Sequence, residues 1–265
     1  MQLAFSFIIG SCLGSFINVL VWRLPRNESI IIPRSYCPKC RKQIKWYENI
    51  PLFSWMLLKA CCSNCQTKIS IRYPFVEFLC AGLFVICCFC SPTLYADFSG
   101  QYKLIAGYIL VFFLLSISII DIYHLWIPRS LCKAGVVAGI SFNAFIGFIA
   151  DNNLFFVLNS FISMLLGYLL FELLRKTASH IYKKPALGHG DSMLSALIGS
   201  WLGIKGLGLS WVLAFLIAGI FALLGLLSKK LKRGDPMPLG PFLSLGCFLI
   251  WIFGNEFWIN NLFIR

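Results

Sequence analysis

Charged residues are scarce in this sequence: they make up 12% of its 265 positions, and only ten of them are acidic. A soluble domain usually has about 25% charged residues, because such side chains cover its surface. Hydrophobic residues make up 59% of the chain, roughly 156 positions, enough for about seven or eight spans of about 20 residues. The composition excludes a soluble enzyme, a disordered chain and a secreted disulfide scaffold. It predicts an all-α polytopic protein in a lipid bilayer.

The charges that are present are mostly positive, with 23 Lys and Arg against 10 Asp and Glu and a net charge of +13. In a soluble protein this excess would suggest nucleic-acid binding. In a membrane protein, however, Lys and Arg accumulate in cytoplasmic loops. We therefore expect no nucleic-acid partner and use the basic residues to predict topology.

Residues 1–22 are expected to form the first span, because the chain has no Lys or Arg before Arg23 and so lacks the basic start of a signal peptide. Gly10 and Gly14 in this span have the GxxxG spacing that lets helices approach closely. Polar residues near Asp97 and the turn Asp151–Asn153 predict two of the later connections. Further apolar stretches run at about 75–91, 104–120, 132–150, 154–174, 192–227 and 239–258.

The stretch 192–227 is too long for one span, and basic segments both precede and follow it. If both basic segments are cytoplasmic, the stretch must cross the membrane twice, and we expect its turn near Lys205 and Gly206. That gives eight spans and places 20 of the 23 basic residues on one side. The sequence therefore predicts a multi-pass membrane protein with both termini in the periplasm or on the exterior.

Five of the twelve cysteines lie in the polar segment 23–73, where Cys37 and Cys40 form one CxxC pair and Cys62 and Cys65 form another. Two such turns can complete a tetrahedral four-cysteine zinc site, and a reducing cytoplasm favours metal over disulfides. Cys61 could replace Cys62 in a longer spacing, although the CxxC spacing favours Cys62. We expect a structural zinc, since four thiolates leave no open coordination position.

Four acidic residues touch the predicted spans, where ionisable side chains are costly and often functional: Glu77, Asp121, Glu172 and Asp191. Asp121 ends the third span, and Asp191 begins the sixth next to Gly188 and Gly190. The predicted topology puts both aspartates near the cytoplasmic border. Either one alone could instead be a snorkelling side chain or an acid favoured by a helix dipole.

Two carboxyl groups in a partly dry site resist ionising together, so one keeps a proton. One can then accept a proton from water while the other protonates a carbonyl oxygen, which is the chemistry of aspartyl peptide hydrolysis. Glu77 could belong to a site or pair with a nearby basic group. Glu172 is expected to form a helix-surface ion pair with Arg175 at i+3. The three histidines do not form a metal set.

Taken together, the motifs resemble those of bacterial type IV prepilin peptidases, membrane aspartyl proteases with a Gly-X-Gly-Asp motif. The resemblance runs through the chain in order and covers more than 200 residues. The matching segments are GSFINVLVWRLP at 14–25, CPKC, IKWYENIPLFSWMLL, CSNC, ISIRYPFVE, DIYHLWIP, GHGD and PLGPFLSLG at 238–246.

The resemblance implies cleavage of a short basic leader after a glycine, at the cytoplasmic face, from prepilins or prepilin-like proteins such as secretion pseudopilins. It also implies N-methylation of the new terminus with S-adenosylmethionine. By position, Asp121 and Asp191 would be catalytic, and Cys37, Cys40, Cys62 and Cys65 would hold the zinc on which methylation depends. The implied domains are a span (1–22), a cytoplasmic zinc-binding domain (23–73) and a seven-span peptidase domain (74–265).

One position departs from the family pattern, because Met193 stands where a lysine usually follows the second aspartate by two residues. We expect this change to tune the site and not to abolish activity. No GxGxxG-type fingerprint marks a methyl-donor site, so methyl transfer rests on the resemblance alone. The alternatives are an ion or metal transporter with intramembrane carboxylates and a peptidase that has lost methylation.

Overall fold

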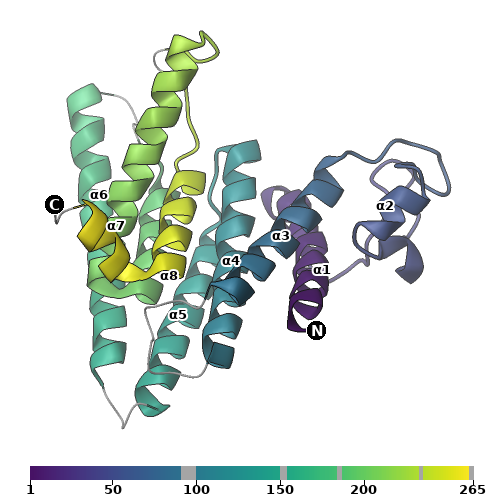
Figure 1. Cartoon of the computed structure of the whole chain (residues 1–265). Helices are drawn as coiled ribbons and strands as arrows, with labels where there is room; N and C mark the ends of the chain where they lie inside the picture. The colour runs from purple at the N-terminus through teal and green to yellow at the C-terminus, as the bar shows by residue number, and fades with distance from the viewer. Residues whose placement is uncertain (91–99, 150–153, 184–186, 233–234, 263–265) are drawn as a thin grey trace. The chain divides into compact units, whose positions relative to one another are not determined.

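The computed structural model describes residues 1–90, 100–149, 154–183, 187–232 and 235–262, and these residues form helices and loops with no β-strand. The predicted connections near Asp97 and at Asp151–Asn153 lie outside the described residues. The chain divides into two compact units (Figure 1): an N-terminal unit, Met1–Cys90, and a C-terminal unit, Ser91–Arg265. The second helix that is long enough to span a membrane belongs to the N-terminal unit. The division into a zinc-binding domain that ends at residue 73 and a peptidase domain that begins at residue 74 stays a prediction.

The N-terminal unit consists of two long helices and the polar segment between them. Helix α1 (Gln2–Arg23) packs against α3 (Arg72–Phe89). Their backbones approach closely, since a Cβ atom added at Gly10 would lie 2.7 Å from Ala81 Cα, and one at Gly14 would lie 2.6 Å from Glu77 Cα. The predicted packing role of the GxxxG spacing is therefore confirmed.

The segment between α1 and α3 has little regular structure. It contains only the short 3₁₀ helices η1 (Leu24–Arg26) and η2 (Trp46–Asn49) and the five-residue helix α2 (Phe53–Leu57). Buried Arg23, at the end of α1, donates hydrogen bonds to the carbonyl oxygens of Ser29, Pro33 and Arg34. This guanidinium therefore ties the start of the segment to the helix from which it emerges.

The C-terminal unit is a bundle of long apolar helices (Figure 1). Among the described residues of the whole chain, seven helices are long and apolar enough to cross a membrane, so the protein is a multi-pass membrane protein. Five of them belong to this unit: α4 (Gly100–His124), α5 (Arg129–Ile149), α6 (Phe155–Tyr182), α7 (His189–Leu227) and α8 (Gly240–Leu262).

Helix α7 folds back on itself at Gly203, which has the non-helical angles φ 70° and ψ −175°. A straight helix would hold Ser195 and Trp211 about 24 Å apart at a rise of about 1.5 Å per residue. Instead, Trp211 Nε1 donates a hydrogen bond of 3.0 Å to Ser195 Oγ. The long apolar stretch therefore forms two antiparallel arms, as predicted from the charges, with its turn two residues before Lys205.

The first arm of α7 is the centre of the C-terminal unit, because every residue from Leu194 to Gly203 is buried. Polar contacts join it to both neighbouring helices: Trp201 Nε1 donates to the Gly135 carbonyl of α5 at 2.9 Å, and Ser195 Oγ donates to the Gly167 carbonyl of α6 at 3.0 Å. Such interhelical hydrogen bonds and small residues are typical of membrane helix packing. This arm carries Asp191 at its start.

Candidate functional site

Asp121 lies in the last turn of α4 and is only 5% exposed. The backbone N–H of Gly240, the first residue of α8, donates a 2.9 Å hydrogen bond to Asp121 Oδ2. Free N–H groups and partial positive charge at a helix start suit a carboxylate. A Cβ at position 240 would lie 2.8 Å from that oxygen, so a larger residue here would force the carboxyl group to move. Sequence reasoning gave Gly240 no role, because only the α4–α8 contact reveals one.

Asp191 lies in the first turn of α7 and is 7% exposed. The Gly188 N–H donates to Asp191 Oδ2 at 2.9 Å, and the Asp191 N–H donates to the Gly188 carbonyl at 3.2 Å. This reciprocal pair caps the helix start. Asp191 is therefore an acid at a helix N-terminus, as the alternative interpretation of the sequence expected. Its carboxyl group is nevertheless buried.

The structure brings the two aspartate segments together at one end of the C-terminal unit. Ile127, in the connection after α4, is buried, and a Cβ at Gly190 would lie 2.5 Å from Ile127 Cβ. Both aspartates are buried, and the segments that carry them pack against each other although the two residues lie 70 positions apart in the chain.

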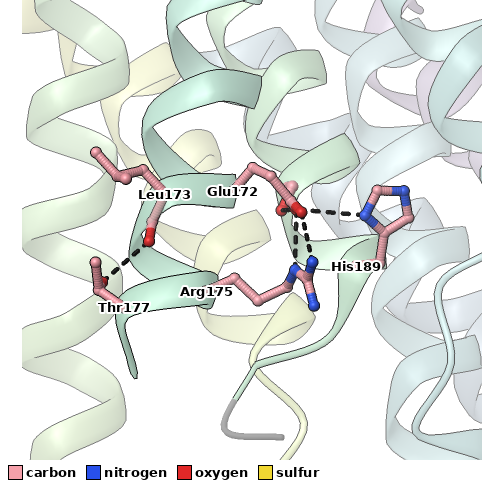
Figure 2. Close-up of polar contacts among 6 residues, drawn as sticks. Glu172, Leu173, Arg175, Thr177 and His189 are labelled. Atoms are coloured by element: carbon pink, nitrogen blue, oxygen red, sulfur yellow. Dashed lines mark hydrogen bonds and ion pairs between the residues drawn. The ribbon is translucent and has the colours of Figure 1, made fainter. Parts of the chain in front are cut away.

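Glu172 of α6 contacts the residues on both sides of the Gly190–Asp191 pair. Its carboxylate accepts a hydrogen bond from Ser192 Oγ at 3.0 Å. It also contacts His189 Nδ1 at 3.3 Å (Figure 2). Arg175 forms a bidentate ion pair with the same carboxylate, with Nε at 2.9 Å from Oε2. The Glu172–Arg175 pair predicted from the i, i+3 spacing is confirmed.

That prediction was nevertheless incomplete, because it treated Glu172 as a surface residue. Helical spacing reveals partners within α6, whereas His189 and Ser192 belong to α7 and meet Glu172 only through the fold. The carboxylate therefore bridges the two helices directly beside Asp191. The sequence did contain one signal of this role: Glu172 is a lone acidic residue in an apolar stretch, and the next apolar stretch begins with the Asp191 motif.

Glu77 of α3 is buried, with 8% of the residue exposed. Its Oε2 accepts a hydrogen bond of 2.8 Å from the backbone N–H of Leu52, and Ser15 of α1 provides a second hydrogen bond. Among the residues that the structure describes, the partners of Glu77 are therefore a backbone amide and a hydroxyl group and not a basic side chain. This favours the interpretation of Glu77 as part of a site over an ion pair with a nearby basic group.

The structure gathers four cysteine side chains in the N-terminal unit, and their sulfur atoms all lie within 4.8 Å of one another. Cys61 lies outside this group. Cys37 Sγ and Cys65 Sγ, which come from different CxxC pairs, are 3.8 Å apart. The members of the group, hereafter the cysteine cluster, are Cys37, Cys40, Cys62 and Cys65.

Both CxxC turns have the same backbone design. In the first, the Arg41 N–H donates to the Cys37 carbonyl at 2.8 Å, and in the second the Gln66 N–H donates to the Cys62 carbonyl at 3.0 Å. Arg41 (φ 57°) and Gln66 (φ 55°), each directly after the second cysteine of its pair, both have positive φ. Two equivalent turns therefore present two thiols each, as the repeated spacing indicated.

The geometry of the cysteine cluster fits a tetrahedral metal ion. Four sulfur atoms at a zinc–sulfur distance of about 2.3 Å lie about 3.8 Å apart, which is the Cys37–Cys65 separation. Hydrogen bonds from the Thr67 hydroxyl and its backbone N–H lower the pKa of the Cys65 thiol to about 6, whereas burial raises the pKa of Cys37 to about 11. A cation would favour the thiolate form of all four.

Two family matches cover most of the chain. Residues 8–91 match the bacterial peptidase A24 N-terminal domain, and residues 108–224 match the type IV leader peptidase family. The first match contains the whole cysteine cluster, and the second contains both aspartates. No solved structure matches the chain significantly.

Curated relatives extend over the same regions. A prepilin leader peptidase/N-methyltransferase of Myxococcus xanthus is 36% identical over 198 residues, which cover 75% of this chain and 55% of the relative. A type 4 prepilin-like proteins leader peptide-processing enzyme of Escherichia coli is 34% identical over 256 residues, 89% of this chain and 88% of the relative. A prepilin leader peptidase/N-methyltransferase of Pseudomonas aeruginosa is 29% identical over 275 residues, 95% and 90%. The chain therefore belongs to the type IV leader peptidase family.

Proposed function

We propose that this protein is a bifunctional enzyme that cleaves the basic leader from type IV prepilins or prepilin-like proteins after a glycine and N-methylates the new terminus. The observation that carries the peptidase assignment is the pair of buried carboxyl groups, Asp121 and Asp191, at one end of the C-terminal unit. The names of the relatives support the same two activities.

The hydrogen bonds of the two aspartates suit acid–base hydrolysis. The Gly240 and Gly188 N–H groups bind Oδ2 of Asp121 and Asp191, which leaves Oδ1 of each carboxyl group for water and substrate. One carboxylate accepts a proton from water, and the water oxygen attacks the scissile carbonyl carbon. The other, protonated carboxyl group donates to the carbonyl oxygen, after which the carbon–nitrogen bond breaks and the amine leaves with a proton.

The charge distribution supports a location in the bacterial inner membrane with the active site at the cytoplasmic face. With segment 23–73 inside, 20 of 23 basic residues are cytoplasmic and both termini are periplasmic. A prepilin carries its basic leader on the same side, so its scissile bond would reach the border where the aspartates lie. A transporter would instead place its carboxylates near the bilayer midplane.

For the cysteine cluster we propose zinc. A bound zinc ion would supply cross-linking of the two CxxC turns and no catalytic chemistry, because four thiolates close its coordination sphere. S-adenosylmethionine would supply the methyl group for the new N-terminal amine. The intact cluster favours retention of methylation over a peptidase that has lost it.

The peptidase assignment can be tested with detergent-solubilised protein, a prepilin and S-adenosylmethionine, with the products weighed by mass spectrometry. Asp121→Asn or Asp191→Asn should lower cleavage by at least about 100-fold, since each removes half of the acid–base pair. The matched control is Asp235→Asn, because Asp235 is an exposed loop acid that caps the Lys232 N–H. Cleavage that persists in both active-site variants would show that another group performs the chemistry.

A further inference from the structure

The N-terminal unit contains a cavity of about 400 Å³ that the peptidase chemistry does not use. Its walls come from the end of α1, both CxxC turns, the segment around α2 and the start of α3. Small-molecule sites usually have volumes of about 300–1,000 Å³ and combine apolar walls with a few polar groups. We propose that this cavity binds S-adenosylmethionine, a binding site that rests on the methyl-transfer activity proposed above.

One acidic side chain of the cavity suits the cationic part of this ligand. S-adenosylmethionine carries a positive sulfonium and a positive ammonium group, and buried Glu77 lines the cavity. Leu52 N–H and Ser15 hold the carboxyl group of Glu77 in place, and a bound cation would favour its ionised form. A fixed negative charge with apolar surroundings attracts a cation more strongly than one in water does.

Asn18 provides a second polar group in the same wall. It is 3% exposed, and its Nδ2 donates to the Tyr73 carbonyl at 3.1 Å and to the Gly14 carbonyl at 3.3 Å. Within the part of the chain that the structure describes, its Oδ1 has no hydrogen-bond partner. A buried acceptor left unsatisfied is unusual, and an N–H donor of a bound ligand would satisfy it.

Aromatic side chains complete the fit. Trp22 of α1 and Trp55 of α2 line the cavity, and Trp55 is fixed by a hydrogen bond of 3.2 Å from its Nε1 to the Ile69 carbonyl. Aromatic faces can stack on the adenine ring and can also contact a cationic sulfonium through their π-systems. The cavity therefore offers a partner for each end of the ligand.

The position of the cavity also explains why methylation would depend on the cysteine cluster. Cys37 and Cys62, one from each CxxC turn, line the cavity, and so do their neighbours Pro38 and Ser63. A metal that joins the two turns would therefore shape one wall of the methyl-donor site. The aspartates belong to the other unit, so cleavage would not need this wall.

The test measures equilibrium binding of S-adenosylmethionine to the full-length, detergent-solubilised protein by calorimetry. Val19→Phe, which adds bulk to the α1 wall, should weaken binding about tenfold or more. Glu77→Gln keeps an acceptor for the Leu52 N–H but removes the charge, and it should also weaken binding about tenfold. The matched controls are Ile8→Phe, on an exposed face of α1, and exposed Glu28→Gln, neither of which lines the cavity.

Normal prepilin cleavage and metal content in each variant would show that the fold is intact. If the wild type binds the ligand and both cavity variants bind it equally well, the cavity assignment is overturned while the methyltransferase assignment stands. If the wild type neither binds the ligand nor methylates, both assignments are overturned.

Photo-crosslinking of methyl-labelled S-adenosylmethionine to the wild type is independent of any variant's folding. Label on peptides from residues 15–77 supports the cavity, and label confined to residues 100–262 contradicts it.

Discussion

The two units of this protein build their sites in opposite ways. In the N-terminal unit, the four cysteines come from one segment of 29 residues, Cys37–Cys65, that contains only short helices. In the C-terminal unit, Asp121 and Asp191 lie 70 positions apart on two long helices. Local turns make the first site, and helix packing makes the second.

This difference teaches which forces maintain each site. Large apolar side chains of the cysteine segment are exposed, among them Trp46 at 82% and Leu57 at 79%, so the segment has a small core of its own. A metal can supply the missing cross-link, as in other small cysteine-rich domains. The aspartate site instead rests on buried helix contacts. We therefore expect one site to depend on metal and the other to be independent of it.

Removing the metal should separate the two sites most clearly. Cys62→Ser, or treatment with a strong chelator, should lower methylation by at least about 100-fold, because a structural metal contributes its binding free energy to folding. Prepilin cleavage should stay within a factor of about two, since the aspartates and the cysteine cluster belong to different compact units. The measurements are metal content by mass spectrometry and the masses of the cleaved and methylated products.

Cys61→Ser is the matched control for this experiment. Cys61 is the immediate neighbour of Cys62 but lies outside the cysteine cluster, so its loss should leave the metal content and methylation unchanged. Equal loss of methylation in both variants would refute the selection of Cys62 as a ligand. Loss of cleavage in Cys62→Ser would show that the two sites are not independent.

Gly240→Ala should produce the next largest effect, a loss of prepilin cleavage at the aspartate site. The added Cβ would lie 2.8 Å from Asp121 Oδ2, so the carboxyl group must move. Displacement of a catalytic group by about 1 Å can cost about 100-fold in rate. The measurement is the cleavage rate, with methylation of a synthetic pilin peptide that already has a free N-terminal amine as the unaffected readout. Gly219→Ala, where a Cβ would meet nothing within 4 Å, is the control.

The local site was the easier one to predict from sequence. The CxxC spacing identified all four members of the cysteine cluster, since each turn is built from hydrogen bonds within a few residues, such as Arg41 N–H to the Cys37 carbonyl. The reversal in α7 was also predictable, because charge parity demanded it. Its turn at Gly203 lies two residues before Lys205, the charged residue inside the apolar stretch that indicated its approximate position.

The aspartate site was predictable only in part. Asp121 and Asp191 stood out because acids are scarce in this chain, and the structure places both at one end of the same unit. The residues that hold the two aspartates in place were not predictable in the same way. Gly240 lies 119 positions from Asp121, and Glu172 meets Ser192 across two helices, so no periodicity within one helix could reveal either contact.

Glu172→Ala should have a smaller effect on cleavage than Gly240→Ala, because it acts on Asp191 only through its neighbours. Without the carboxylate, Ser192 and His189 lose their α6 partner, and the start of α7 is held less firmly. We expect cleavage to fall about tenfold, mainly in kcat, since a misplaced acid–base group affects the chemical step. Glu172→Gln should restore part of the rate, because it keeps an acceptor for Ser192. A rise in KM with kcat unchanged, or no rescue by Gln, would contradict a positioning role.

Arg175→Gln should have the smallest effect on cleavage. It separates the Glu172–Arg175 ion pair from the contacts that Glu172 makes to α7. The guanidinium is more exposed than its partner, with 28% of its side chain accessible against 15% for Glu172. Exposed ion pairs contribute about 0.2–1 kcal/mol, so cleavage should fall less than about fivefold. The contacts of Glu172 to His189 and Ser192 remain in this variant. A loss as large as that of Glu172→Ala would mean that the ion pair, and not the bridge between α6 and α7, holds Asp191 in place.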